Sequence, residues 1–143
     1  MSNTSRSTYT GTAPFLTAAG ANAVLTAALA EADRTGVPEC VAVVDAGGHL
    51  LAFGRTDGAR TASISIALTK AVSAATRKRA TADESGGDLL ATVRSALAAD
   101  RVTGIGGGIP LVVDGHVVGG LGVSSGTIDE DIVVAKAGVA ALS

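Results

Sequence analysis

The polar side chains best suited to chemistry stand at a few junctions of a chain that is otherwise poor in charge. Arg55 and Asp57 lie in "GRTDGA", where an apolar stretch ends and a helical pattern is about to begin. An arginine fork beside an Asp-Gly turn with exposed backbone N–H groups suits a carboxylate or phosphate ligand. The alternative is an Arg-Asp pair that only fixes the turn, and spacing alone favours this local role slightly.

Lys70 is the only charged residue between Arg60 and Arg77, and its neighbours are small or apolar. A lysine ammonium partly removed from water has a lowered pKa and can serve as a base, a Schiff-base amine or an anchor for an anion. The alternative is a lysine on the solvent face whose stem covers alanines. The sequence agrees equally well with both interpretations.

Two further segments offer backbone N–H groups. In "TGIGGGIPL", Gly107 and Gly108 precede Pro110, and such glycines let the backbone come close to a ligand or a partner chain. The run matches neither a P-loop nor a dinucleotide fingerprint. In "GVSSGT", Ser124 ends a strand pattern where a helix starts, so N–H groups there could hold an anion. The acidic residues that follow favour helix capping as the simpler role.

The two histidines, His49 and His116, each follow a glycine at a hairpin turn, where exposure to solvent is the default. They show no metal-ligand spacing with each other or with Cys40, so no metal site is predicted. Cys40 lies in an apolar run, which indicates a buried, inert thiol.

The order of elements favours an α+β fold. Apolar spacing predicts helices, and β-branched or alternating runs around "AGG" and "DG" predict two hairpins. This gives the order α-β-β-α-α-β-β-α, which lacks the alternation of a parallel fold and favours an antiparallel sheet with helices packed on it. The predicted ranges are helices 17–35, 63–78, 88–100 and 126–142, with strands in 41–55 and 109–125.

Composition limits the class of protein. The 143 residues fit one domain, and with aromatic residues at 2% and 19 glycines, small side chains must fill the core and let the layers approach closely. A net charge of -2 argues against nucleic-acid binding. No apolar run is long enough for a membrane span or a signal peptide, which predicts a cytoplasmic protein. We expect a flexible N-terminal tail over residues 1–15 and a domain over residues 16–143.

Three segments together resemble the GlcG/HbpS family, which includes the C-terminal domain of PduO-type proteins. They are "VAVVDAGGHLLAFGRTDGA", "SISIALTKAVSAA" and "GGGIPLVVDGHVVGGLGVSSGTIDEDIVVAKAGV". The resemblance implies a profilin-like α/β sandwich with an antiparallel sheet, and assembly into dimers or larger rings. It carries the family pattern onto Arg55, Asp57, Lys70, the loop from Gly107 to Pro110, and Ser124. Thr56 stands where the family pattern has methionine, and Ser125 stands where it has glycine.

The resemblance implies a small-ligand-binding protein, and haem is one candidate cofactor at a subunit interface. Beyond Met1, the side chains with the usual haem-ligand atoms are Tyr9, Cys40, His49 and His116. The alternative function is a cofactor-independent enzyme that transfers protons on an anionic metabolite. In that reading Lys70 or Asp57 moves the proton, while Arg55 and backbone N–H groups hold the anion. Both readings place the ligand near Arg55, Asp57, Lys70 and the glycine loop, in a homo-oligomer.

Overall fold

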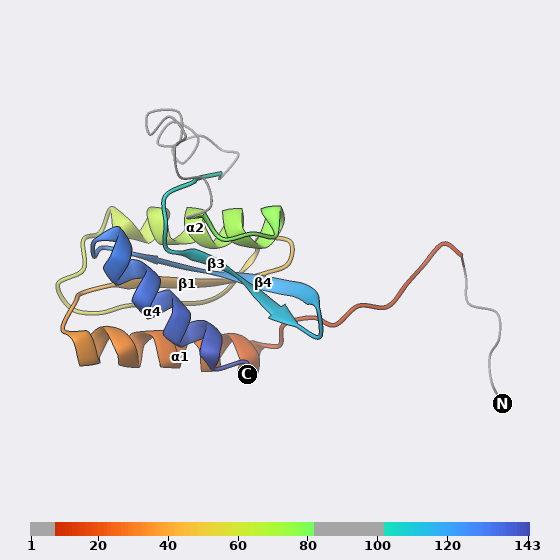
Figure 1. Cartoon of the computed structure of the whole chain (residues 1–143), viewed down its shortest axis with the longest axis horizontal. Coiled ribbons are helices and arrows are strands. Elements are labelled where there is room, and N and C mark those ends of the chain that lie inside the picture. The colour runs from red at the N-terminus through yellow and green to blue at the C-terminus, as the bar shows by residue number, and fades with distance from the viewer. Residues whose placement is uncertain (1–7, 82–101) are drawn as a thin grey trace.

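The computed structural model describes residues 8–81 and 102–143, which form a sandwich of helices around one sheet (Figure 1). The α+β class and the antiparallel sheet predicted from the sequence are confirmed. The elements are α1 (Ala18–Thr35), β1 (Cys40–Asp45), β2 (Leu50–Arg55), α2 (Ser63–Arg77), β3 (Gly108–Val113), β4 (His116–Ser124) and α4 (Ile128–Ala140).

The four strands lie in the order β2-β1-β4-β3, and every neighbouring pair is antiparallel. Both hairpin turns therefore lie at one end of the sheet, which we call the hairpin end. At the opposite end, β2 and β4 finish at Arg55 and Ser124, and β1 and β3 begin at Cys40 and Gly108. We call this second end the polar end, because buried polar side chains gather there.

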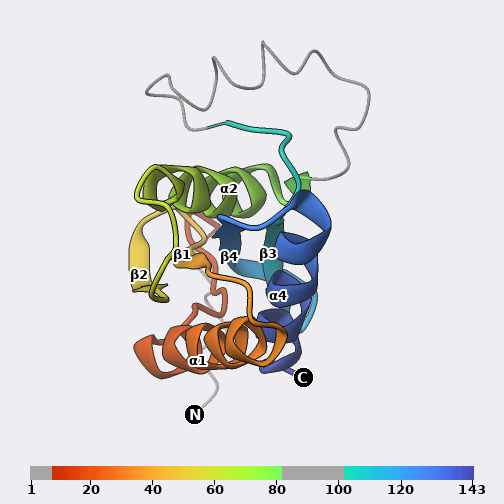
Figure 2. The same ribbon diagram turned by 90° about the vertical axis from the view of Figure 1, so that its left-hand side faces the viewer.

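The helices cover the two faces of the sheet unequally. Figure 2 shows α2 alone on one face, with α1 and α4 on the other. The larger core lies between the sheet and the α1–α4 layer, and it includes Val24, Val41, Leu111 and Leu121, all fully buried. The smaller core lies under α2 and consists mainly of alanine and valine side chains. None of the helices in the described part of the chain is long and apolar enough to cross a membrane.

Local signals in the sequence account for where the elements begin and end. The side chain of Thr17 accepts a hydrogen bond from the backbone N–H of Gly20, and Gly36 ends α1 in the left-handed conformation. Thr127 and Glu130 form the predicted capping box at the start of α4. The β3–β4 turn has positive φ at both Asp114 and Gly115, as a two-residue hairpin requires.

Two further predictions concern a helix over residues 88–100 and an N-terminal tail over residues 1–15. The helix predicted over residues 88–100 lies outside the described residues. Of the predicted N-terminal tail, residues 8–15 are described, and they run without secondary structure away from the hairpin end (Figure 1).

The close approach of α2 to the sheet depends on glycines in β4. A Cβ atom built on Gly122 would lie 2.0 Å from the carbonyl oxygen of Ala67, and one on Gly120 would lie 2.2 Å from that of Ala71. Both distances are far below van der Waals contact, so the backbone of α2 rests directly on the backbone of β4. Small side chains in this layer follow from that spacing.

We predict that Gly122→Ala destabilises the fold by about 3 kcal/mol or more, because a methyl group must push α2 away from the sheet. Urea unfolding followed by circular dichroism measures the change. Gly11→Ala is the matched control, since nothing lies within 4 Å of its added Cβ. Equal stability of the two variants would show that α2 does not rest on β4 through Gly122.

Candidate functional site

The polar end collects most of the residues that the sequence singled out. Antiparallel register places Arg55 beside Cys40 and Cys40 beside Ser124, so three adjacent strands carry these residues in one row. The carbonyl of Gly107 accepts a hydrogen bond from the backbone N–H of Val123 at 3.0 Å, which brings the glycine loop to the same end.

Lys70 is the centre of this end. It lies on α2 and is only 1% exposed, so the solvent-facing alternative is wrong. Its Nζ donates to the carbonyl oxygen of Val123 at 2.8 Å and to Oδ2 of Asp131 at 3.0 Å. A Cβ on Gly107 would lie 2.9 Å from the same nitrogen, so glycine at this position leaves room for the ammonium group.

Two carboxyl groups share the space beside Lys70. Asp131, in the first turn of α4, pairs with the lysine through Oδ2 and accepts the backbone N–H of Gly126 at 3.0 Å through Oδ1. Glu39 immediately precedes β1 and is fully buried. Its Oε2 accepts from the same Gly126 N–H at 3.2 Å, while Oε1 has no hydrogen-bond partner among the described residues.

The burial and the neighbouring charges shift the pKa values of two groups in this cluster, Glu39 and Lys70. Burial, together with the neighbouring Asp131 carboxylate, raises the pKa of Glu39 from 4.5 to about 8. Glu39 is therefore predominantly protonated at neutral pH and can donate a hydrogen bond. Burial also lowers the pKa of Lys70, and the Asp131 carboxylate partly opposes that shift. The cluster thus contains one ion pair and one adjacent neutral acid.

Thr56 fixes the backbone of Glu39. Its Oγ1 accepts from the N–H of Glu39 at 2.8 Å, and its own N–H donates to the carbonyl of Glu39 at 3.0 Å. The threonine that departs from the family pattern therefore holds the residue that carries the buried acid.

An open depression of about 440 Å³ adjoins this cluster at Gly126, whose backbone N–H bonds to Glu39 and Asp131. Its lining includes Pro38, Arg60 and Ser125. Arg60 donates from its guanidinium to the carbonyl of Ser125 at 3.0 Å, and from its backbone N–H to Ser125 Oγ at 3.1 Å. Ser125 adopts φ of 116°, a strained conformation for a residue with a side chain. The family pattern has glycine at this position, which the backbone conformation explains.

Only some of the expected site residues lie together in the buried polar end. Lys70, Gly107, Gly108 and Ser124 are buried together, whereas Arg55 and Asp57 are exposed and form no ion pair with each other. Pro110 pairs with Gly120, two residues further along β3 from the polar end.

Sequence reasoning missed Glu39, Arg60 and the buried role of Asp131. Asp131 lies in the acidic first turn of α4, where a carboxylate is already explained by the helix dipole. The sequence therefore offered no reason to pair it with Lys70. Glu39 has one usable signal: it is a single charged residue directly before a strand that is apolar over five positions.

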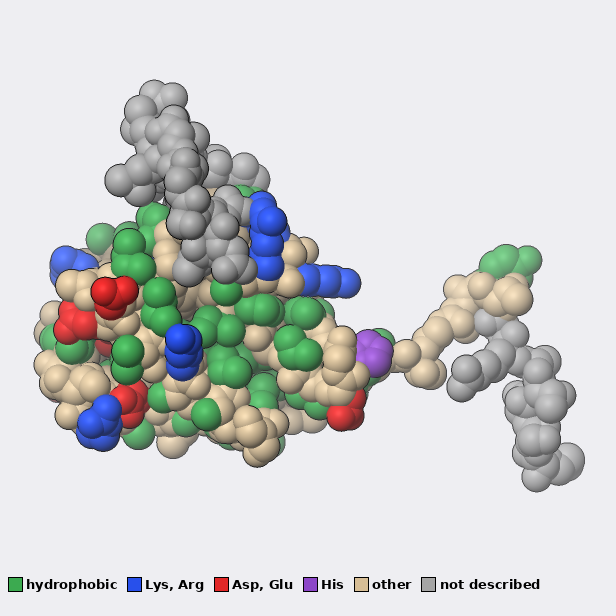
Figure 3. Space-filling model, viewed as in Figure 1, with side chains coloured by type: hydrophobic (Ala, Val, Ile, Leu, Met, Phe, Trp, Pro, Cys, Tyr) green, Lys and Arg blue, Asp and Glu red, His purple; other side chains and the backbone are tan. Residues whose placement is uncertain are grey.

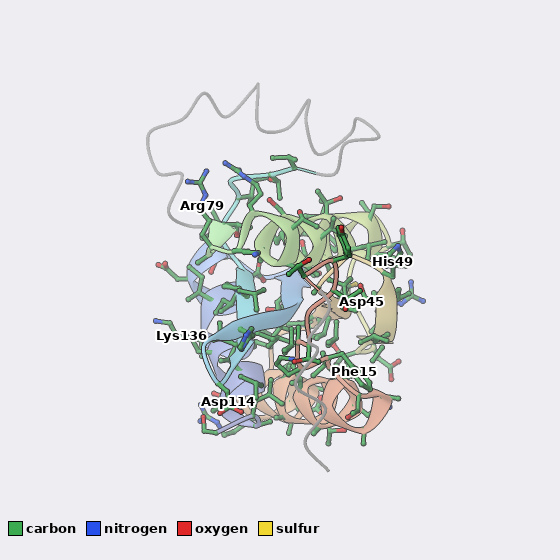
Figure 4. All side chains as sticks on the ribbon, turned by 90° about the vertical axis from the view of Figure 1, so that its right-hand side faces the viewer. Phe15, Asp45, His49, Arg79, Asp114 and Lys136 are labelled. Carbon is green, nitrogen blue, oxygen red and sulfur yellow. The ribbon has the colours of Figure 1, made fainter. Side chains whose placement is uncertain are left out.

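The histidines lie at the hairpin end, which faces the viewer in Figure 4. His49 Nδ1 lies 3.2 Å from Oδ1 of Asp45, and His116 Nδ1 lies 3.0 Å from the carbonyl oxygen of Asp114. Both rings are exposed. Cys40 is fully buried, as predicted, and burial raises the pKa of its thiol. Within residues 8–81 and 102–143, no three His, Cys, Asp or Glu side chains are grouped to hold a metal ion.

A family model described as "Haem degrading protein HbpS-like" matches residues 16–140. The chain belongs to this HbpS-like family. It is 36% identical to the protein GlcG of Escherichia coli K12 over 105 residues, which cover 73% of this chain and 77% of GlcG.

Solved structures extend the family likeness to the fold. A crystal structure of HbpS is 30% identical with a TM-score of 0.82, and the match covers 97% of this chain and 98% of HbpS. A PduOC–haem complex is 29% identical with a TM-score of 0.78, covering 91% of this chain and 96% of PduOC. The predicted resemblance to the GlcG/HbpS family is thereby confirmed.

We predict that stability falls with rising pH because of Glu39. The folded state keeps a proton that the unfolded chain releases, since the folded pKa is about 8 and the ordinary value is 4.5. The stabilisation is fully present below the ordinary pKa and is lost as pH rises through the folded pKa, at no more than about 1.4 kcal/mol per pH unit. Urea unfolding of wild type and Glu39→Gln at intervals from pH 5 to pH 8 measures this loss.

Glutamine matches the shape of glutamate and does not titrate, so the slope should be smaller in Glu39→Gln. Glu31→Gln is the control, because Arg34 lowers the pKa of the Glu31 carboxyl and keeps it ionised over this range. Parallel pH profiles for wild type and Glu39→Gln would contradict the assignment of the proton to Glu39.

Proposed function

We propose that the chain is a small-ligand-binding protein of the HbpS type, and that haem is its ligand, held at the hairpin end where a second subunit completes the site. Family membership and the likeness to a haem-bound PduOC structure support haem as the ligand class. The observation that carries the proposal is the restraint on both histidine rings.

A histidine that binds a metal usually offers one ring nitrogen to the metal and donates the other N–H to an oxygen acceptor. His49 has the Asp45 carboxylate at Nδ1, and His116 has the Asp114 carbonyl at Nδ1. Each acceptor orients its ring and leaves Nε2 available to bind iron. Of the four side chains with haem-ligand atoms, these two would therefore be the ones able to bind the iron, whereas Cys40 is fully buried in the core.

Few exposed apolar side chains near the hairpin turns could contact a porphyrin ring. Leu50 is 54% exposed and Val112 is 48% exposed, and both lie in strands near the hairpin turns. They lie in the two opposite edge strands of the sheet, so each would contact only part of a porphyrin and a second subunit would supply the remaining contacts. When bound, haem would supply iron-centred redox or oxygen chemistry. His49 or His116 would bind it, and Asp45 and Asp114 would orient these rings.

We expect haem titration of the purified protein to give a Soret band that saturates at a fixed ratio of haem to chain. Replacing the histidine that would bind the iron by alanine should weaken haem binding by about tenfold or more, because the iron would then lose its protein ligand. The measurement uses His49→Ala, His116→Ala and the double variant, each followed by absorbance.

Asp45→Asn is the matched control for the orientation of His49, since it keeps the ring and weakens its acceptor. It should reduce affinity less than His49→Ala, in the direction expected for an outer partner of a metal ligand. Unchanged binding by the double histidine variant would refute histidine ligation. No Soret shift in wild type would exclude haem as the ligand.

A cofactor-independent enzyme is the second candidate, favoured by the buried acid at the polar end. Glu39, with a pKa near 8, can exchange a proton close to neutral pH. The depression that adjoins it through Gly126 has Arg60 at its wall, and a small carboxylate there would meet the guanidinium. In this proposal Lys70 keeps the charge of Asp131 balanced, and Arg55, Asp57 and Ser124 belong to the surrounding ligand-binding end.

This second candidate predicts that the protein catalyses exchange of the C3 protons of a small 2-oxo acid, which lie next to the keto carbonyl, with solvent deuterium. The exchange is followed by proton NMR over a panel of such acids in heavy water. Glu39→Gln should abolish it, while Asp129→Asn, in the first turn of α4 but outside the cluster, should leave it intact. Equal exchange by Glu39→Gln and wild type would remove Glu39 as the proton carrier.

A further inference from the structure

The extended segment before α1 carries an unusual share of the aromatic side chains. Residues 8–15, which we call the arm, hold Tyr9 and Phe15, and the whole chain has only one tyrosine, two phenylalanines and no tryptophan. Tyr9 is 95% exposed and Phe15 is 79% exposed. Figure 3 shows the arm standing clear of the body. Aromatic side chains of this size release free energy when they are buried, so the arm has surface to offer a partner.

A matching hollow lies at the polar end, between the end of α1 and the start of α4. It measures about 320 Å³ and is lined by Thr35, Val37, Asp129, Glu130 and Val133. Its walls are mainly apolar, and its two carboxylates come from the first turn of α4. Glu130 already accepts the N–H of Thr127, whereas the Asp129 carboxylate accepts no hydrogen bond from the described residues.

We propose that Tyr9 of one copy of this chain binds in this hollow on a second copy. The ring would lie against Val37 and Val133, and the phenolic O–H would donate to the Asp129 carboxylate. An apolar pocket with an acceptor at its rim suits tyrosine better than phenylalanine, because the hydroxyl keeps a hydrogen bond on burial. The arm has no charged residue between Thr8 and Phe15, so it brings no like charge to the acidic rim.

The chain's own arm would have to lie fully extended along α1 to bring Tyr9 near the hollow. Tyr9 is seven residues before Leu16, so its Cα lies at most about 23–25 Å from Leu16. Leu16 is buried and anchors the arm at the hairpin end. The hollow lies beyond the last turn of α1, an 18-residue helix about 27 Å long, at the opposite end. The arm also leaves in the direction away from the hollow (Figure 1).

In a dimer with a two-fold axis beside α1, each arm can reach the hollow of the other copy. When two α1 helices lie antiparallel, the start of each is next to the end of the other, and each arm reaches the hollow of its partner. The exposed positions Ala19, Ala23, Thr26 and Ala30 recur on one side of α1 and are small and uncharged, so two such helices can approach closely. The proposed dimer is therefore a reciprocal exchange of arms.

Cysteine cross-linking tests the contact directly. We expect a Tyr9→Cys chain mixed under mild oxidation with a tagged Val133→Cys chain to give a covalent heterodimer. Each single variant alone should give none, because the two Tyr9 positions are far apart in a reciprocal dimer. The native thiol of Cys40 is buried and does not compete. Absence of the heterodimer, or cross-linking only within one chain that carries both cysteines, would overturn the proposal.

Fluorescence gives a second test without a cross-link. Because the chain contains no tryptophan, Tyr9→Trp and Thr10→Trp each report a single site. We expect the Tyr9→Trp emission to be blue-shifted and protected from acrylamide at micromolar protein, and to return to the solvent-exposed spectrum on dilution. Thr10→Trp is the matched control, because residue 10 has no part in the proposed contact and should stay exposed. Identical spectra for the two variants would refute the binding of Tyr9.

The outcome is independent of the proposed ligand. Arm exchange is measured without haem, and haem titration is measured on the wild-type chain, so either proposal can fail while the other stands.

Discussion

The direct contact between the backbones of α2 and β4 is the constraint on which the rest of this molecule depends. It exists because Gly120 and Gly122 present no side chain to α2, where any Cβ would overlap the carbonyls of Ala71 and Ala67. A helix held this close can keep only small side chains on its inner face. That requirement explains the alanine-rich smaller core and the very low aromatic content.

The same contact places Lys70 where its side chain can link the two helix layers on either side of the sheet. Its ammonium group passes the end of β4 and meets Asp131, so α2 on one face of the sheet is joined to α4 on the other. A buried ion pair adds little net stability, because desolvation offsets the attraction, but the loss of either partner leaves an uncompensated charge. We therefore regard the pair as a device that fixes the relative position of the helices.

The exposed histidines and the buried ionisable cluster lie at opposite ends of the sheet. The hairpin end carries exposed histidines whose Nδ1 atoms are restrained, while the polar end carries a buried ion pair and a neutral acid. The two residues that depart from the family pattern, Thr56 and Ser125, both lie at the polar end. Thr56 holds the backbone of Glu39, and Ser125 holds Arg60. These contacts tie both departures to the surroundings of the buried acid.

Local sequence signals were sufficient for the elements that the structure describes, because each signal acts over a few residues. Thr17 and Gly36 bound α1, the Thr127–Glu130 capping box starts α4, and Asp114–Gly115 closes the second hairpin. The family resemblance added that Lys70 and the glycine loop belong together. It did not show the ion pair, because Lys70 and Asp131 are 61 residues apart and the acidic run that contains Asp131 also has a local explanation.

Burial is a property of the packed layers, and only the tertiary structure decided it. Lys70 could have faced solvent on the evidence of its neighbours, and the close approach of α2 to β4 is what encloses it. Glu39 becomes an acid with a raised pKa because the start of β1, the Gly126 turn and α4 meet around it. No short stretch of sequence contains those three parts, so the proton on Glu39 is determined by the fold.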